Sequence, residues 1–215
     1  MTRMMRNIGK WLAVWVAFSC VQPIFADEFI SVKKVYDGDT IEMANGVHVR
    51  YIGINAPEIS HENRPDEPYA LEAMVFNEKM VLSKPVRLQT DTDRSDQFQR
   101  MLAYVFLKDG TFVNQEMVRN GLAYVLYSVP NTTYDQVLLK TQQEAMQSKR
   151  GMWGNWKEKN TTYSGNRSSR RFHLKTCAMG QRISPQNRVQ FNRKWDAFWE
   201  GYAPCKKCLG QGVIE

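Results

Sequence analysis

The segment Asp37-Gly38-Asp39-Thr40 is followed by a short turn and then by the run Val49-Arg50-Tyr51-Ile52-Gly53-Ile54-Asn55-Ala56-Pro57-Glu58. Apolar and polar residues alternate up to Ile52, as in a strand with one buried face. Asn45-Gly46, between the two halves, is the strongest short signal for a β-hairpin. Short strands joined by tight turns bring their polar ends to one rim of a sheet, so we expect the carboxylates of this segment to lie close together.

Further strands are predicted on both sides of this hairpin. Apolar alternation favours strands at 29–35, 40–43, 47–52, 86–90 and 101–107, with a last short strand at 122–127. A helix is expected between the third and fourth of these strands, and more helices near the end of the domain. This order predicts a small five-stranded Greek-key barrel with helical cover, of the α+β class.

The predicted helices have definable ends and faces. The helix after Pro68 stops before Pro85, and a later helix begins at Thr132 or Thr133 as N-cap and closes at Gly151. The first helix is expected to bury one stripe of apolar side chains. These side chains are Leu71, Met74, Val75 and Leu82.

Charge is distributed unevenly along the 215 residues, which are 43% hydrophobic with a formal net charge of +7. Residues 157–215 carry twelve Lys and Arg against four Asp and Glu, whereas residues 27–156 carry fourteen against eighteen. The apolar content excludes a disordered chain. The acidic part contains the proposed metal site, and the basic part is the better candidate for holding a polyanion.

The N-terminus is typical of a targeting segment. Arg3, Arg6 and Lys10 precede a short apolar run that is too brief to span a bilayer, and Ala26 precedes acidic residues. We interpret residues 1–26 as a signal peptide, so the mature protein is expected to be exported, periplasmic or secreted, with no stable membrane span after processing. An uncleaved anchor and a lipid-modified Cys20 are the alternatives.

Oxygen atoms near the hairpin suit a calcium ion. Asp39 and Asn55 offer side-chain oxygens, and the backbone carbonyl of Ala56 adds another. Hard oxygen ligands of this kind are those that Ca²⁺ prefers. A lone Asp-Gly-Asp-Thr motif is more often an ordinary turn, so the interpretation depends on the whole set.

The same segment can also act on a phosphodiester. Hydrolysis of this bond needs a cation on the phosphate, guanidinium donors on the developing charge and an oriented water. Glu58 can act on the water, and Arg50 and Arg100 can grip the phosphate with forked donors.

Several separated motifs between about Phe29 and Trp156 resemble the staphylococcal-nuclease-like (thermonuclease) family of calcium-dependent enzymes on an OB-type barrel. They are Asp37–Thr40, Val49–Glu58, Asp96–Tyr104 and Val113–Ala123. Their order along the chain also fits. The resemblance implies an endonuclease, a hydrolase whose partner is DNA, with RNA as a second candidate.

The resemblance also assigns roles to individual residues. It implies that Asp39 binds calcium, with Asp37 and Thr40 in the layer of residues behind the metal. It implies that Glu58 activates or positions water and that Arg50 and Arg100 bind the phosphate. Phe98 and Tyr127 would contact the bound nucleic acid.

Three positions depart from the family pattern. Asn55 stands where the family usually has Asp, Gln99 where it has Gly, and Val129 where the best-known member has an aromatic residue. A carboxamide offers an oxygen without a charge, so calcium should bind more weakly. Asn55 therefore keeps open a rival function, a catalytically weak or inactive nucleic-acid-binding protein.

Four residues near the C-terminus have the spacing of zinc ligands. His173 and Cys177 form one pair, and Cys205 and Cys208 form another, with 27 residues between Cys177 and Cys205. The mature chain keeps three cysteines, which cannot all pair with one another. A structural zinc ion is our interpretation, and a disulfide with one free thiol is the alternative.

The surroundings of these ligands resemble the Ada-type zinc-binding module, with His173 in place of its first cysteine. The resemblance covers roughly Tyr163 to Leu209. We do not expect the methyl-acceptor activity of that family, and a repair or sensor protein is disfavoured by the leader. The expected organisation is a signal peptide at 1–26, a nuclease-like domain at 27–156, a linker at 157–171 and a zinc module at 172–215.

Overall fold

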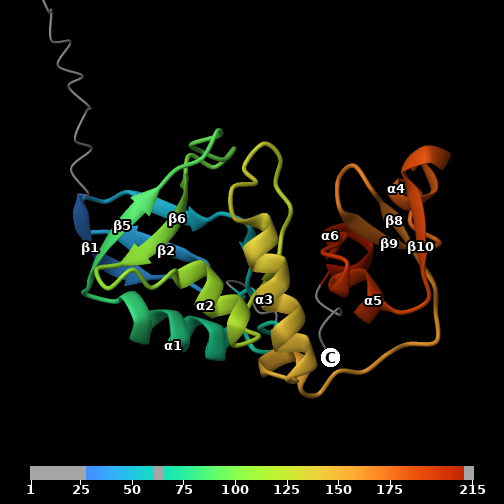
Figure 1. Cartoon of the computed structure of the whole chain (residues 1–215), viewed down its shortest axis with the longest axis horizontal. Coiled ribbons are helices and arrows are strands. Elements are labelled where there is room, and N and C mark those ends of the chain that lie inside the picture. Colours follow the sequence, from blue (N-terminus) through green and yellow to red (C-terminus); the bar gives the residue numbers. More distant parts are fainter. Residues whose placement is uncertain (1–27, 61–64, 211–215) are drawn as a thin grey trace, which may run out of the picture.

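The computed structural model describes residues 28–60 and 65–210 (Figure 1), so the predicted signal peptide lies outside the described residues. Five strands form a closed barrel in the order β1-β2-β3-β6-β5. β3 and β6 are parallel, and the other pairs are antiparallel. The predicted five-stranded barrel is confirmed. The strands are β1 (Phe29–Val35), β2 (Thr40–Met43), β3 (His48–Tyr51), β5 (Pro85–Gln89) and β6 (Met101–Leu107).

The hairpin of β2 and β3 sets the positions of the polar residues at the barrel rim. Its turn contains Gly46 at a φ of 84°, a conformation that glycine adopts without steric cost. The register places Thr40 opposite Arg50, and Arg50 lies beside Leu102 of β6. Thr40 begins β2 directly after the acidic turn, so this register brings Arg50 next to that turn.

Three helices and a second, two-stranded sheet complete the barrel unit. The helices are α1 (Ala70–Val81), α2 (Val113–Arg119) and α3 (Asp135–Gln147), followed by a 3₁₀ turn, η1 (Gly151–Trp153). β4 (Ile54–Asn55) pairs antiparallel with β7 (Tyr124–Val125), with Asn55 opposite Tyr124. The predicted strand at 122–127 is therefore present, in shorter form and outside the barrel. In the part of the chain that the structure describes, no helix has the length and apolarity needed to cross a membrane.

The predicted apolar stripe of α1 is wrong at its two leucines, whereas Met74 does pack against the core. Leu71 is 56% exposed and Leu82 is 38% exposed, whereas α1 buries Ala70, Ala73, Asn77 and Val81. The reason lies in what this helix packs against. A Cβ atom added to Gly38 would stand 2.8 Å from Cβ of Ala73, so the small residues let the acidic turn approach the helix closely.

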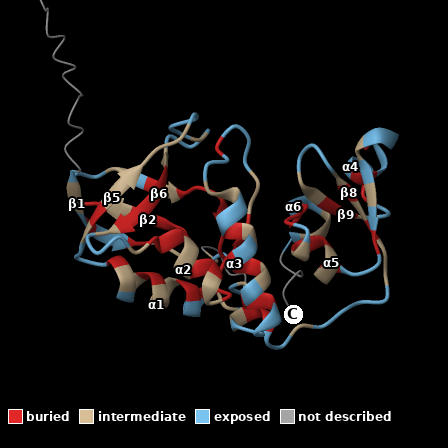
Figure 2. Ribbon diagram, in the orientation of Figure 1, coloured by how far each residue is buried: buried red, intermediate tan, exposed pale blue. Residues whose placement is uncertain are grey.

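Asn77 then fastens the acidic turn to α1. Its Nδ2 donates to the carbonyl of Asp37 at 3.0 Å, and its Oδ1 accepts from the Tyr51 hydroxyl at 2.9 Å. Asn77 is fully buried, and its side-chain oxygen and nitrogen each have a partner, so it costs little to bury. The barrel core is formed mainly by strand residues such as Ile41, Val49 and Val105. Figure 2 shows buried residues along the barrel strands.

The C-terminal part forms a four-stranded sheet in the order β10-β8-β9-β11. Its antiparallel pairs are β10 with β8 and β8 with β9, and β11 is parallel to β9. Short helices flank this sheet. The elements are β8 (Tyr163–Asn166), β9 (Arg171–Leu174), α4 (Ala178–Gln181), η2 (Pro185–Asn187), β10 (Arg188–Phe191), α5 (Lys194–Trp199), β11 (Ala203–Pro204) and α6 (Lys206–Leu209).

The predicted linker at 157–171 is too long, because β8 lies inside it and β9 begins at Arg171. The polar composition of this segment indicated a loop. Gly165 is instead buried under Val189, Phe191 and Tyr202, and a Cβ there would stand 2.6 Å from the Phe191 ring. A glycine at a crowded strand position gives no apolar signal in the sequence, so the strand was missed.

A second core joins the C-terminal sheet to the barrel unit through α3. Phe198 of α5 packs edge-on against Tyr124 and Trp153, and Gln142 of α3 donates to the Phe198 carbonyl at 2.5 Å. The Gln142 Oε1 also accepts the backbone N–H of Val125 at 2.7 Å. Figure 1 shows α3 between the barrel and the C-terminal sheet. The two parts are therefore packed against each other through buried contacts.

Asp135 is the first residue of α3, and the N-terminus of this helix lacks the threonine cap that the sequence predicted. The N-cap is Tyr134 and makes no side-chain cap, so the predicted Thr132 or Thr133 cap is wrong. Both Asp135 carboxylate oxygens are buried without a hydrogen-bond partner. Burial and the charge of Asp91 raise the pKa of Asp135 to about 6.

Asp135→Asn should stabilise the protein at about pH 8 but not at about pH 4. The Asp135 carboxyl has a pKa of about 6 in the folded protein and near 3.8 in the unfolded chain. Between these values the folded protein holds a proton that the unfolded chain has lost, so the stability of the parent protein falls as the pH rises from 3.8 to 6. At about pH 8 we expect the substitution to raise the free energy of unfolding by about 1 kcal/mol, which corresponds to about 2–4 °C in Tm. The effect is limited to this size because the carboxyl is only half-buried.

Thermal unfolding at the two pH values measures this effect. Asp109→Asn is the matched control, because hydrogen bonding by Thr111 lowers the pKa of that exposed carboxyl and the gain at high pH should be missing. An Asp135→Asn protein that is no more stable than the parent at pH 8 would contradict the assignment.

Candidate active site

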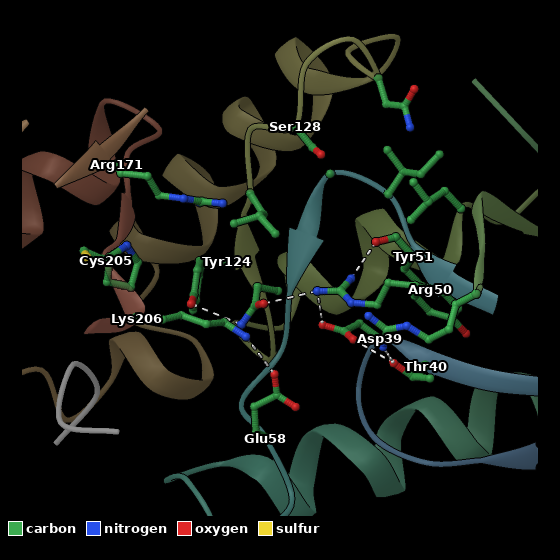
Figure 3. Close-up of a pocket in the computed structure, with 18 of the residues that line it drawn as sticks. Asp39, Thr40, Arg50, Tyr51, Glu58, Tyr124, Ser128, Arg171, Cys205 and Lys206 are labelled. Atoms are coloured by element: carbon green, nitrogen blue, oxygen red, sulfur yellow. Dashed lines mark hydrogen bonds and ion pairs between the residues drawn. The ribbon is translucent and has the colours of Figure 1, made fainter. Parts of the chain in front are cut away.

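A cleft of about 430 Å³ lies between the barrel rim and the C-terminal sheet (Figure 3). Residues from both parts of the chain form its walls. The barrel contributes Asp39, Thr40, Arg50, Asn55, Glu58 and Arg100, β7 contributes Tyr124, and the C-terminal unit contributes Arg171, His173, Cys205, Lys206 and Lys207.

Arg50 lies at the centre of the barrel wall of this cleft. Its Nη1 donates to the carbonyls of Tyr51 at 2.6 Å and Ile54 at 2.9 Å. Its Nη2 donates to Asn55 Oδ1 at 3.1 Å and pairs with Asp39 Oδ2 at 3.0 Å. The two carbonyls hold the planar guanidinium in place, so its remaining donors bridge the two predicted metal-ligating side chains.

Asp39 is 5% exposed and fully engaged by its neighbours. Its Oδ2 accepts the backbone N–H of Ala56 at 2.6 Å, and its Oδ1 accepts from the Thr40 hydroxyl at 3.2 Å. Asp37 Oδ1 accepts the backbone N–H of Asp39 at 2.8 Å. Asp37 and Thr40 therefore each form a hydrogen bond with Asp39.

The paired acids of this turn oppose one another electrostatically. Burial and the neighbouring charge of Asp39 raise the pKa of Asp37 to about 7. Burial likewise raises the pKa of Asp39, against the opposing effect of Arg50. Both acids therefore hold a proton more readily than an exposed carboxyl does.

Asn55 is buried and makes contacts with both of its amide atoms. Nδ2 donates to the Ala56 carbonyl at 3.0 Å and to the Tyr124 hydroxyl at 3.1 Å, while Oδ1 faces Arg50. The carbonyl predicted as a metal ligand at Ala56 therefore accepts a hydrogen bond from the neighbouring carboxamide. Asp39 and Asn55 line the cleft, whereas Ala56 is not among its lining residues.

Arg100 completes the barrel wall. Its Nε donates to Asp96 Oδ2 at 2.8 Å, and its Nη1 stands 3.5 Å from the Thr40 hydroxyl. Phe98, which is 68% exposed, has its ring centre 5.6 Å from the guanidinium carbon. Arg50 and Arg100 thus approach the same short stretch of β2 from two sides.

Glu58 stands at the lower edge of the cleft in Figure 3 with its side chain 51% exposed. Its backbone N–H donates to Glu67 Oε2 at 3.0 Å, and its carbonyl accepts from the Glu67 backbone at 3.1 Å. Its Oε1 pairs with Lys206 Nζ at 3.2 Å, across 148 positions of sequence. The backbone is fixed while the carboxylate remains accessible.

The two side chains predicted to contact nucleic acid, Phe98 and Tyr127, do not line the cleft. Tyr127 lines a different hollow with Asp135 and Gly201, so it is not brought into the cleft. Tyr124, three positions earlier, lines the cleft instead and bonds to Asn55. The alternation of the short strand did not identify Tyr124, because its partner strand is only two residues long.

The four predicted zinc ligands come together at the module end of the cleft. The ligand atoms of His173, Cys177, Cys205 and Cys208 all lie within 4.8 Å of one another, and the three cysteines are free. Cys177 Sγ is 3.5 Å from His173 Nδ1. A sulfur and a nitrogen ligand on a zinc tetrahedron stand about 3.6 Å apart, so the donor set and its spacing fit that ion.

Comparisons with known proteins agree with this architecture. Residues 48–155 match the family described as Staphylococcal nuclease homologue. The chain is 36% identical over 125 residues to a thermonuclease of Staphylococcus intermedius, covering 57% of this chain and 74% of that protein. It is 33% identical over 132 residues to a thermonuclease of Staphylococcus hyicus, covering 60% and 78%. It is 36% identical over 129 residues to endonuclease YncB of Bacillus subtilis, covering 58% and 61%.

Proposed function

The chain belongs to the staphylococcal nuclease family. We therefore propose that it is a calcium-dependent endonuclease that acts on phosphodiester bonds of DNA, with RNA as a second substrate. One observation carries the proposal. Asp39, Arg50, Glu58 and Arg100 come from separate segments of the chain and all line a single cleft.

Calcium would be held by Asp39, by Oδ1 of Asn55 and by the carbonyl of Ala56. The fit rests on the donor set, which is all oxygen. When bound, the ion would polarise the phosphate and offset the charge that develops on it. The layer formed by Asp37 and Thr40 fixes the orientation of Asp39 before any ion arrives.

The remaining chemistry is assigned to three side chains. Arg50 and Arg100 both line the cleft and are assigned to one phosphate, where they would stabilise the negative charge of the transition state. The Nη2 of Arg50 contacts Asp39 and Asn55 in this structure, and it would turn to the phosphate when calcium takes these two side chains. Glu58 accepts the proton of the attacking water, because its carboxylate is accessible and its backbone is anchored. Its exposed partner Lys206 must move aside for this step.

Asn55→Asp should raise the affinity for calcium by about tenfold, because it adds a charge to the ligand set. In the variant without calcium, a carboxylate oxygen would face the Ala56 carbonyl in place of Nδ2, so its melting temperature should fall. Calorimetric titration with calcium measures the first effect, and thermal unfolding measures the second.

Asn45→Asp is the control, because it adds the same charge at an exposed turn position. An unchanged calcium titration for Asn55→Asp would remove Asn55 from the ligand set.

We propose a structural zinc ion at His173, Cys177, Cys205 and Cys208. Purified mature protein should contain about one zinc per chain, and Cys177→Ser should lower this content. Elemental analysis measures the metal. A protein without zinc, in which mass spectrometry finds a disulfide between two of these cysteines, would favour the alternative.

Export through a signal peptide at residues 1–26 is part of the same proposal. The mature N-terminus is then Asp27, which N-terminal sequencing of exported protein checks. A protein that keeps residues 1–26 after export would contradict this cleavage site.

Plasmid cleavage tests the proposed function. Mature protein should degrade DNA when calcium is added and stop when a chelator removes it. The rival is a nucleic-acid-binding protein without catalysis, which the carboxamide at Asn55 favours. Binding of DNA without cleavage under any divalent ion would establish the rival and end the proposal.

A further inference from the structure

We propose that the C-terminal unit completes the cleft with a second phosphate subsite, formed by Arg171, Lys206 and Lys207. This subsite binds a backbone phosphate of the nucleic-acid strand next to the scissile one. The inference rests on the proposed nuclease function and extends it, since it assigns strand binding to residues outside the matched family segment, which ends at residue 155.

Arg171 provides the first observation. It begins β9 and reaches into the cleft beside Tyr124, and its Nη1 is buried with no hydrogen-bond partner (Figure 3). Among the buried side-chain atoms without a partner in residues 28–60 and 65–210, it is the only one on a cationic group. A buried guanidinium N–H without an acceptor is costly, so its position indicates an anionic ligand.

The second observation is the distribution of charge between the two walls. Both acids of the cleft, Asp39 and Glu58, are on the barrel wall. The residues that the C-terminal unit contributes to the lining include three cations and no acid. A wall of this composition favours an anion, and a polynucleotide strand that enters the proposed site must run past it.

The third observation is how the two lysines are placed. The backbone N–H of Cys205 donates to the Phe172 carbonyl at 2.9 Å, which ties the start of α6 to β9 and to Arg171. Lys206 and Lys207 follow directly. The Lys206–Glu58 pair is 75% and 51% exposed, so it is weak, and a phosphate can replace Glu58 as partner.

Lys206 would therefore exchange its partner when a strand binds, from the Glu58 carboxylate to a backbone phosphate. Without substrate it contacts the carboxylate assigned to the attacking water, and with substrate it contacts the adjacent phosphate. Strand binding would thereby free Glu58 for catalysis. The zinc ligands on either side of the two lysines, Cys205 and Cys208, would fix this wall.

Equilibrium binding separates this subsite from a general basic surface. The probe is a fluorescent single-stranded DNA of about twelve nucleotides, within the site sizes of OB folds, in buffer without calcium. Arg171→Gln should weaken its Kd by about tenfold or more, as expected for a charge-assisted hydrogen bond. The double variant Lys206→Ala/Lys207→Ala should weaken it by a similar factor.

The control variants are Arg182→Gln and Lys175→Ala/Arg182→Gln. They remove the same charges from exposed positions of the same unit outside the cleft. Their Kd should change by less than about threefold. The slope of log Kd against log salt should fall by about 0.7 for Arg171→Gln, the value for one lost phosphate contact on a single strand.

Steady-state kinetics gives a second readout. For Arg171→Gln, KM should rise about tenfold on the oligonucleotide and stay unchanged on a p-nitrophenyl nucleotide diester, which has one phosphodiester only. Equal losses of affinity in the cleft variants and their controls would overturn the inference. If Arg171→Gln does not fold by circular dichroism, the double lysine variant, with exposed side chains, decides alone.

The two proposals fail in different ways. Cleavage by the parent protein with equal behaviour of cleft and control variants rejects the subsite and keeps the nuclease. Weaker binding in the cleft variants of a protein that cleaves nothing rejects the nuclease and keeps the phosphate subsite.

Discussion

Glu58→Gln should lower the rate of phosphodiester hydrolysis by about 10²–10⁴-fold, the range for losing a general base. The carboxamide keeps the size of the side chain and removes its ability to accept a proton. The backbone at this position is held by Glu67 and not by the Glu58 side chain, so the fold should be unaffected. Initial rates at saturating calcium and DNA measure the effect.

Measuring KM and calcium affinity beside the rate shows whether Glu58→Gln affects the chemical step or the binding of substrate and metal. KM and calcium affinity should change little, because the side chain is assigned to neither substrate nor metal binding. Glu72→Gln, an equal change at an exposed position of α1, should retain full activity. A Glu58→Gln protein with more than a third of the parental rate would show that another group activates the water.

Arg50→Met should remove activity and also destabilise the protein by about 3–5 kcal/mol, or about 10 °C in Tm. The side chains of Arg50 and Asp39 are only 12% and 7% exposed, so losing the guanidinium leaves Asp39 buried without its partner. Methionine keeps the apolar bulk of the side chain. Thermal unfolding and cleavage rates report the two effects separately.

The double variant Asp39→Asn/Arg50→Met distinguishes the two roles. It removes both charges, so it should regain much of the stability that Arg50→Met loses and remain inactive. If Arg50→Met retained both stability and activity, Arg50 would be neither the partner of Asp39 nor a phosphate ligand.

Sequence patterns predicted the barrel correctly, and several residues predicted for its rim line one cleft. The alternation from Val47 to Ile52 and the turn at Asn45-Gly46 are local signals, and local signals determine a hairpin register. Once Thr40 lies opposite Arg50, the acidic turn and the guanidinium must meet. The four zinc-ligand candidates were also found from spacing alone, and the fold brings them together.

The errors come from packing between distant segments. The buried face of α1 depends on the close approach of Gly38, and β8 is buried around a glycine that has no side chain to signal it. Tyr127 was predicted from the family resemblance, and the two-residue strand β7 has no alternation that would identify Tyr124 as the tyrosine lining the cleft.

Nothing in the sequence predicted that the barrel and the C-terminal unit would both line the same cleft. Glu58 and Lys206 are separated by 148 positions, and their contact depends on how α3 and α5 pack. The basic composition of residues 157–215 indicated that this part of the chain binds a polyanion. It did not indicate that Arg171 and Lys206 would face the barrel rim.

A crystal structure of the mature protein with calcium and a nucleoside 3′,5′-bisphosphate tests the central claim most directly. The account predicts calcium on Asp39 and Asn55, one phosphate between Arg50 and Arg100, and Glu58 on the water side of that phosphate. A phosphate bound away from both arginines, or calcium bound away from Asp39, would contradict it.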